Sequence, residues 1–318
     1  MSGSRERSKA IGMLILATPC WALSFPVMKA LELEQQRLLP GVNTWFLTVL
    51  GVMIRFGISG LLMMPLLFRA GKFTRRELEQ GLVLSLFGGG GIAFQMDGLS
   101  YTMASTSAFL TQGYIVFIPL WLILTIGKWP SPKIFLCVTL MVLGMAVLVN
   151  LDVHSFKLGR GELETIIASL SFTGQILCLE HPRYAGNRPV QFSVAMFLMM
   201  SLFCWPLIMV TAPNVEACWR VFASPAAVCF MVVLILVCSL AGYLIMNYWQ
   251  KKVAATEAGL IYCIEPVCAS ALALFLPGWF SQWGGINYPN ETLTDHLLIG
   301  GVLVTVANVL LQVKKRNA

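Results

Sequence analysis

Residues 225–249 read PAAVCFMVVLILVCSLAGYLIMNYW, an apolar stretch without a charged side chain. The hydrocarbon core of a bilayer is about 30 Å thick and takes roughly 20 helical residues to cross, so this stretch predicts a transmembrane helix. The same criterion finds ten such runs along the chain, at residues 11–30, 44–68, 80–99, 105–126, 134–150, 161–180, 191–211, 225–249, 254–276 and 296–313. We therefore expect an all-α integral membrane protein with ten transmembrane helices.

The composition of the whole chain agrees with this interpretation. Of 318 residues, 57% are hydrophobic and only 12% are charged, which is about half the charged fraction of a soluble domain. The net charge of +7 does not indicate nucleic-acid binding, because the basic residues lie beside apolar spans and not on one soluble face. Most Lys and Arg residues fall in the N-terminus, the even-numbered connections and the tail. This asymmetry predicts that both termini and residues 69–79 are cytoplasmic and that residues 277–295 are outside.

Several kinds of chemistry find no support in the sequence. No GxxxxGK[ST] motif is present, so ATP bound by this chain is not expected to drive it. The nine cysteines lack CxxC or Cys/His ligand spacing, and the three histidines map to connections or span ends. We therefore expect no cofactor, no metal site and no enzymatic activity. The run Gly88–Gly91 lies inside a predicted span and indicates close helix packing or a local kink.

A short internal repeat divides the chain into two halves. A shift of 150 residues superposes Thr106, Ala108 and Leu110 on Thr256, Ala258 and Leu260. These residues belong to the fourth and ninth predicted spans, so each half has five spans and the second half is inverted relative to the first. We predict two inverted five-helix repeats, residues 1–152 and 153–318. This arrangement is typical of secondary transporters, which hold their substrate near the midplane between the halves.

Four motifs, in order along the chain, resemble the EamA-type family of the drug/metabolite transporter superfamily. They are Trp21-Ala22 with Ser24, Phe25 and Lys29; Arg55-Phe56; Tyr101-Thr102 leading into Thr106–Thr111; and Leu260–Val267, which ends in Glu265-Pro266-Val267. The resemblance implies two repeats of five spans and transport of small metabolites across a bacterial inner membrane. The chain departs from the family pattern at Ile126-Gly127-Lys128 and in the long insertion at 276–295.

Three charged residues inside predicted spans are the first site candidates: Arg55, Asp97 and Glu265. A charge at the centre of a transmembrane helix costs about 2.5–3.5 kcal/mol, so each is expected to have a partner, water or a role. Arg55 could clamp other groups of the protein or contact the substrate, and Asp97 could bind substrate or extend to the outer interface. We predict that Glu265, near the midplane, is the functional carboxylate, with Arg55 as its charge partner until protonation or substrate releases it.

Neutral hydrogen-bonding and aromatic side chains from both halves complete the predicted site. They are Gln95, Gln112, Gln175 and Asn247, with Trp21, Phe25 and Tyr262, and Tyr101, Tyr114 and Tyr243 are expected around them. A cavity of this mixed character suits a small zwitterionic or amphipathic metabolite, because a phosphorylated substrate would require paired Lys or Arg and only Arg55 is available. Hydrogen bonds between helices are the structural alternative for the polar members of this set.

These features lead us to expect a secondary active transporter that works by alternating access and exports amino acids or related compounds. The direction of transport is implied by the resemblance alone. One alternative is efflux of cationic drugs, with Glu265 and Asp97 attracting the cation and aromatic rings stacking on it. Another is a non-transporting membrane scaffold or sensor. The expected partners are a small-molecule substrate and membrane lipid, with proton coupling as a hypothesis and the oligomeric state left open.

Overall fold

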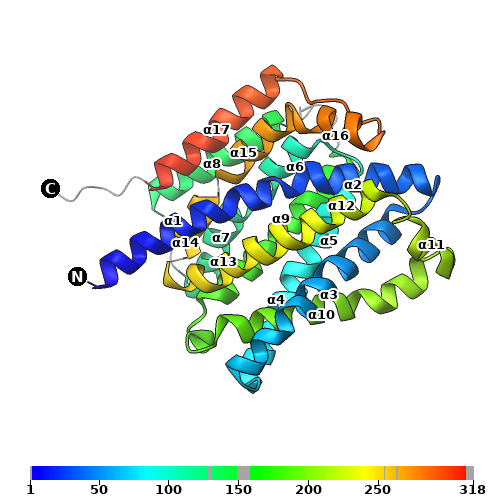
Figure 1. Cartoon of the computed structure of the whole chain (residues 1–318). Helices are drawn as coiled ribbons and strands as arrows, with labels where there is room; N and C mark the ends of the chain where they lie inside the picture. The colour runs from blue at the N-terminus through cyan, green and yellow to red at the C-terminus, as the bar shows by residue number, and fades with distance from the viewer. Residues whose placement is uncertain (1, 128–130, 149–157, 254, 263, 313–318) are drawn as a thin grey trace.

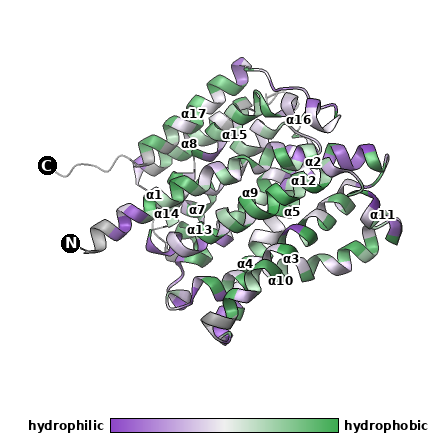
Figure 2. Cartoon of the chain, in the orientation of Figure 1, coloured by the Kyte–Doolittle hydropathy of each residue, from purple (hydrophilic) through white to green (hydrophobic). Residues whose placement is uncertain are grey.

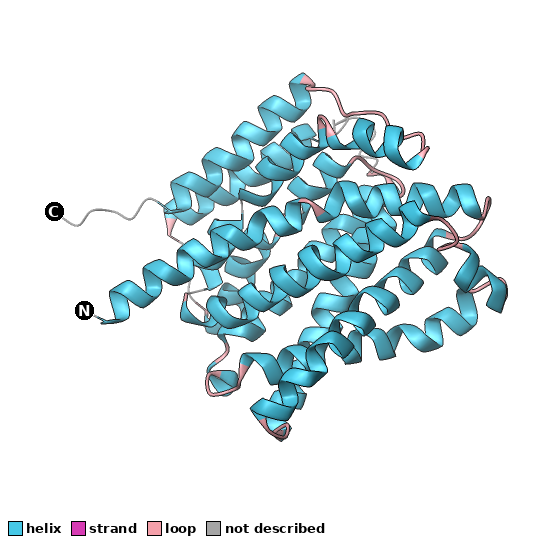
Figure 3. Ribbon diagram, viewed as in Figure 1, coloured by secondary structure: helices cyan, strands magenta, loops and turns pink. Residues whose placement is uncertain are grey.

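The computed structural model describes residues 2–127, 131–148, 158–253, 255–262 and 264–312. Within these ranges every regular element is a helix (Figure 3). The α-helices are α1 (Ser2–Ala22), α2 (Ser24–Leu38), α3 (Thr44–Ala70), α4 (Arg75–Leu84), α5 (Gly90–Leu99), α6 (Ala104–Thr111), α7 (Tyr114–Ile126), α8 (Pro132–Leu148), α9 (Arg160–Glu180), α10 (Pro189–Thr211), α11 (Val215–Arg220), α12 (Pro225–Val233), α13 (Gly242–Trp249), α14 (Ala255–Tyr262), α15 (Ile264–Ala273), α16 (Leu276–Gly284) and α17 (Asp295–Gln312). Short 3₁₀ turns are η2 (Pro182–Tyr184) and η4 (Gln250–Lys252), and π-helical segments are η1 (Ser85–Gly89) and η3 (Leu234–Ala241).

Seven helical segments of the described chain are long and apolar enough to cross a membrane. They are Glu6–Leu38, Thr44–Leu67, Arg75–Leu99, Ala104–Thr125, Arg160–Glu180, Pro189–Thr211 and Pro225–Lys252. The pair α15 and α16, bent by 48°, would make an eighth, and shorter apolar helices cover Phe135–Gly144 and Asp295–Ala307. The protein is therefore an all-α, multi-pass membrane protein, whereas the count of ten spans stays a prediction.

Polar and apolar residues are separated along the length of the helices. Hydrophilic residues gather at helix ends and connections, and hydrophobic residues cover much of the helix flanks (Figure 2). The start of α1 and the end of α17 lie on the same side of the bundle (Figure 1). Such a bundle can present its flanks to lipid and its ends to water.

The helices pack in a pattern that repeats between the two halves. Helix α3 packs against α10, and α8 packs against α17. Helix α1 contacts α13, α14 and α15, while α9 makes the corresponding contacts with α5, α6 and α7. In the second half the counterparts of α5, α6 and α7 are α13, α14 and α15, and the counterpart of α1 is α9. Exchanging each helix for its counterpart gives the same set of contacts. Helices α1 and α9 thus occupy equivalent positions in the two halves.

Two helices at equivalent places in the halves contain π-helical turns. These are η1, between α4 and α5, and η3, between α12 and α13. π turns change the direction of the side chains that follow and are frequent at functional sites. Near η1, a Cβ on Gly88 would lie 2.8 Å from Cε of Met200, and one on Gly91 would lie 2.5 Å from the ring of Phe172. The close helix packing predicted for Gly88–Gly91 is confirmed at these two glycines.

The connection between α9 and α10 is tied to α4 by two ion pairs. Glu77 accepts hydrogen bonds from Nε and Nη2 of Arg188 at 2.7 and 2.9 Å, and its side chain is almost fully buried. Glu79, two residues further along α4, accepts a hydrogen bond from Nη2 of Arg183 at 2.8 Å. These contacts fix the first half of the chain to the second on the side of the bundle where α4 begins.

Candidate functional site

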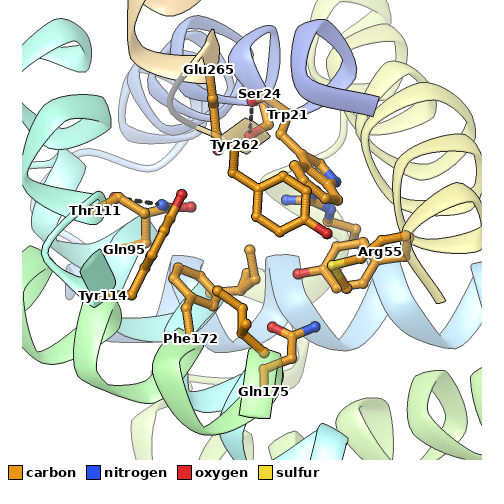
Figure 4. Close-up of a pocket in the computed structure, with 14 residues that line it drawn as sticks. Trp21, Ser24, Arg55, Gln95, Thr111, Tyr114, Phe172, Gln175, Tyr262 and Glu265 are labelled. Carbon is orange, nitrogen blue, oxygen red and sulfur yellow. Dashed lines mark hydrogen bonds between the residues drawn. The ribbon is translucent and has the colours of Figure 1, made fainter. Parts of the chain in front are cut away.

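A pocket in the middle of the bundle collects side chains from both halves (Figure 4). Its volume is about 60 Å³, which leaves room for a few water molecules. The walls are formed by α1, α2, α3, α5, α6, α7, α9, α13, α14 and α15. Six of the residues predicted from the sequence line it: Trp21, Arg55, Gln95, Gln175, Tyr262 and Glu265.

Arg55 forms one wall of the pocket and is only 1% exposed. Its Nε donates to Oγ of Ser239 at 2.6 Å, and its Nη1 lies 3.4 Å from Sδ of Met28. The guanidinium also lies 5.2 Å from the ring centre of Phe56. None of the ion pairs among the described residues includes Arg55. The pocket therefore contains a buried cation that Ser239 and Met28 contact and that has no counter-ion in the part of the chain that the structure describes.

Glu265 lies in the first turn of α15 and is 7% exposed. Its carboxylate has the side-chain amide of Gln112 as a hydrogen-bonding neighbour, and none of the ion pairs among the described residues includes it. Figure 4 shows Glu265 and Arg55 on different sides of the rings of Trp21 and Tyr262. The predicted charge pair between Arg55 and Glu265 is therefore not formed in this structure, because the aromatic side chains separate the two groups.

Three aromatic side chains of the pocket form a cluster. The ring of Trp21 lies 5.1 Å from that of Tyr262 and 6.2 Å from that of Tyr243, in edge-to-face arrangements. A Cβ on Gly242 would overlap the indole of Trp21, so the absence of a side chain there makes room for the ring. The indole Nε1 of Trp21 is buried and has no hydrogen-bond partner among the described residues. The hydroxyl of Tyr262 donates to Oε1 of Gln250 at 2.6 Å, which fixes its ring.

The side-chain amides of the two glutamines that line the pocket differ in their hydrogen-bond partners. Nε2 of Gln95 donates to Oγ1 of Thr111 at 3.0 Å, and that hydroxyl donates to the carbonyl of Ser107 at 2.8 Å. Gln175, on α9, has a buried Nε2 without a hydrogen-bond partner in the described chain. A buried donor without a partner costs about 1–3 kcal/mol, so Gln175 is suited to donate to a bound molecule.

Asp97 lies outside the pocket, contrary to its predicted place in the site. Its Oδ2 accepts a hydrogen bond from Nη2 of Arg160 at 2.5 Å, and Nε of the same guanidinium donates to Glu164 at 2.9 Å. The guanidinium also lies over the ring of Tyr101 at 4.2 Å. Two residues along a helix correspond to a turn of about 200°, so Asp97 faces α9 while Gln95 faces the pocket.

Gln112, Asn247 and Phe25 also do not line the pocket. Gln112 accepts from the hydroxyl of Tyr114 at 2.5 Å, and Asn247 donates to Oγ of Ser193 at 2.8 Å. Phe25 is fully buried in the hydrophobic core. Gln112 and Asn247 thus each make a hydrogen bond inside the protein, while Oδ1 of Asn247 has no partner among the described residues.

The pocket also contains residues outside the predicted set. They are Ser24, Ile92, Thr111, Phe172, Ile176 and Met246, whereas Tyr114 and Tyr243, which were expected around the cavity, also line it. Phe172 and Ile176 could have been found from helical periodicity, because they lie three residues before and one residue after Gln175 on a helix that was already predicted. Ile92 and Met246 gave no such signal, since they resemble the lipid-facing residues of other spans.

Comparisons with known proteins agree with this arrangement of two halves around a central pocket. The model of the EamA-like transporter family matches residues 8–150 and again residues 160–287. One solved crystal structure is similar over 96% of each chain, with a TM-score of 0.61 and 14% sequence identity, and this likeness concerns the fold alone. A comparison with curated proteins finds no match. Members of the matched family are membrane transporters and not enzymes, and the two matches cover most of the chain: it belongs to the EamA-like transporter family.

Proposed function

We propose that this protein is a secondary active transporter that exports small zwitterionic metabolites, with amino acids as the leading class. Membership of the family supports transport across a membrane. The observation that carries the substrate class is the presence of Arg55 and Glu265 in one pocket without a charged partner for either among the described residues. Buried charges are costly unless paired. A zwitterion would supply both of the missing opposite charges.

The surrounding side chains support recognition of such a molecule. In our proposal the carboxylate of the substrate binds Arg55, and its ammonium group lies between Glu265 and the aromatic rings, where a cation–π contact adds to the attraction. The unpartnered donors of Trp21 and Gln175 face the same space and can bind the substrate's oxygen atoms.

A cationic drug is a less suitable substrate for this pocket. The aromatic cluster beside Glu265 would attract a cation, but Arg55 in the same pocket would repel it. Asp97, the second carboxylate expected to attract a drug, is paired with Arg160 outside the pocket. A scaffold or sensor without transport would have no need for a central pocket that contains opposite charges.

We propose further that the two halves, residues 1–152 and 153–318, are inverted repeats of five spans that provide alternating access to the pocket. The exchange symmetry of the helix contacts supports this, since α1 contacts the second half as α9 contacts the first. The π-helical segments η1 and η3 support it as well, because a shift of 150 residues carries Ser85–Gly89 into Leu234–Ala241. The pocket lies between these equivalent elements, where an inverted-repeat transporter holds its substrate.

The orientation and the energy source belong to the same proposal. Both termini would be cytoplasmic in the inner membrane, in agreement with the distribution of Lys and Arg. Proton coupling would use Glu265, because a proton and the ammonium group of the substrate would compete for the same carboxylate.

Transport by purified protein in proteoliposomes tests the proposal. Vesicles preloaded with one unlabelled amino acid from a panel should accumulate the same labelled amino acid by counterflow, while cationic dyes and phosphorylated sugars should not accumulate. The flux should depend on pH in the wild type and lose that dependence in Glu265→Gln. Counterflow of cationic dyes without counterflow of any amino acid would overturn the substrate class, and absence of all flux from a folded protein would favour the scaffold.

A further inference from the structure

Helix α9 separates two spaces of different character. Phe172, Gln175 and Ile176 face the central pocket. Leu170, Thr173, Gly174, Leu177 and Cys178 line a second space on another face of the same helix, closed on its sides by Val83, Phe87 and Trp121. The volume of this second space is about 500 Å³, and its walls are almost entirely apolar. Because α9 separates the two spaces, this groove is distinct from the proposed substrate site.

The groove is open toward the side of the bundle, where lipid would lie. Phe87, Trp121 and Leu170 are 42, 53 and 55% exposed, although all three are large and apolar. Gly174 deepens the groove, since a Cβ there would lie 2.5 Å from the ring of Phe87. The length also fits one leaflet, because the helix rises about 15 Å over the ten steps from Leu170 to Glu180 and half of a hydrocarbon core is also about 15 Å.

The end of the groove beyond α9 is polar and positively charged. His181, Arg183 and Tyr184 line it there. The side chain of Arg183 is 57% exposed although it is bonded to Glu79, and this hydrogen bond raises the pKa of Arg183 above its ordinary value. Arg75 is close enough to act on Glu79 as a second cation, so positive charge exceeds negative charge at this rim. Exposed guanidinium groups at the level of the headgroups attract lipid phosphate.

We propose that this groove binds one anionic phospholipid of the leaflet on the side of the chain termini, with an acyl chain along α9 and the phosphate at Arg183. The acyl chain covers apolar surface between α4, α7 and α9 that helix contacts leave open. This assignment is independent of the substrate of the central pocket.

Native mass spectrometry of the detergent-purified protein tests the proposal. The protein is mixed with equal amounts of phosphatidylglycerol and phosphatidylcholine of the same chain length, and the retained lipid is counted. The wild type should retain more phosphatidylglycerol than phosphatidylcholine. Leu177→Trp, which fills the groove, should lower retention of both lipids about tenfold, and Arg183→Gln should remove the preference for phosphatidylglycerol, since a hydrogen bond to a charged group is worth about tenfold or more.

Two control variants separate this site from general effects. Leu202→Trp places the same ring at a 66% exposed position on α10 outside the groove, and Arg76→Gln removes a charge from the same side of the protein without touching the groove. Both should retain lipid as the wild type does. If Leu177→Trp does not fold, Leu170→Trp at an exposed position of the groove replaces it.

Three results would overturn the proposal. The first is that the groove variants retain as much lipid as the wild type. The second is that the control variants lose as much lipid as the groove variants. The third is that the wild type retains the two lipids equally. If the groove variants lowered transport but retained lipid unchanged, the occupant would be the transported molecule and not a phospholipid.

Discussion

Glu265→Gln combined with a change in the substrate tests the recognition of the ammonium group. The carboxylate of Glu265 faces the pocket and forms no ion pair among the described residues, and a glutamine there can still accept a hydrogen bond from the neighbouring amide of Gln112, so the substitution breaks no ion pair of the protein. A hydrogen bond between charged groups contributes about 1.5–3 kcal/mol, which corresponds to about 10- to 150-fold in apparent affinity. The melting temperature should be equal to or above that of the wild type, because a buried charge without a partner is removed.

The assay is competition for uptake in proteoliposomes by an amino acid and by the same acid without its amino group. Glu265→Gln should lower the apparent affinity for the amino acid by about 10- to 150-fold and change the apparent affinity for the deaminated acid by less than about threefold. Gln95→Asn is a matched control, since it shortens a side chain of the pocket without changing its charge. Equal weakening of both compounds would refute the reasoning, because Glu265 would then support the pocket and not the ammonium group.

Three further predictions concern packing, stability and topology. Gly242→Val should push the adjacent indole into the pocket and reduce uptake at least about tenfold, whereas Gly90→Val, where a Cβ meets nothing within 4 Å, should not; equal loss in both would contradict the packing. Glu77→Gln should lower the apparent free energy of unfolding by about 1–3 kcal/mol in a thermal or denaturant assay, because two buried charge-assisted bonds are lost, and an unchanged stability would contradict this. In a background without reactive native cysteines, Asn287→Cys should react with an impermeant reagent added outside and Lys72→Cys only after permeabilisation; the reverse would exclude the proposed orientation.

The helices could be predicted from the sequence, because a run of apolar residues has to match the thickness of the bilayer. Residues 161–180 and 191–211 were predicted as spans, and the helices there are Arg160–Glu180 and Pro189–Thr211. Glu265, Tyr262 and Gln175 were predicted as site residues because polar or aromatic side chains at mid-span are unusual in hydrocarbon, and all three line the pocket.

The sequence could not predict which polar residues face each other. Depth along a helix follows from counting residues, but the direction of a side chain depends on neighbouring helices. Asp97 was assigned to the site, yet its partner is Arg160, 63 positions further along the chain. Arg55 was expected to pair with Glu265, but its Nε donates to the hydroxyl of Ser239. Such partners become visible only when helices far apart in the sequence are placed together.

Equilibrium binding to the purified wild-type protein tests the central claim most directly. An amino acid, the amine without its carboxylate and the acid without its amino group would be compared in one titration series. If Arg55 and Glu265 each bind one end of the substrate, the zwitterion should bind at least about tenfold more tightly than either analogue, because each analogue leaves one charge of the pocket unpaired. Binding of the amine as tight as that of the amino acid would contradict the account and identify a cation carrier.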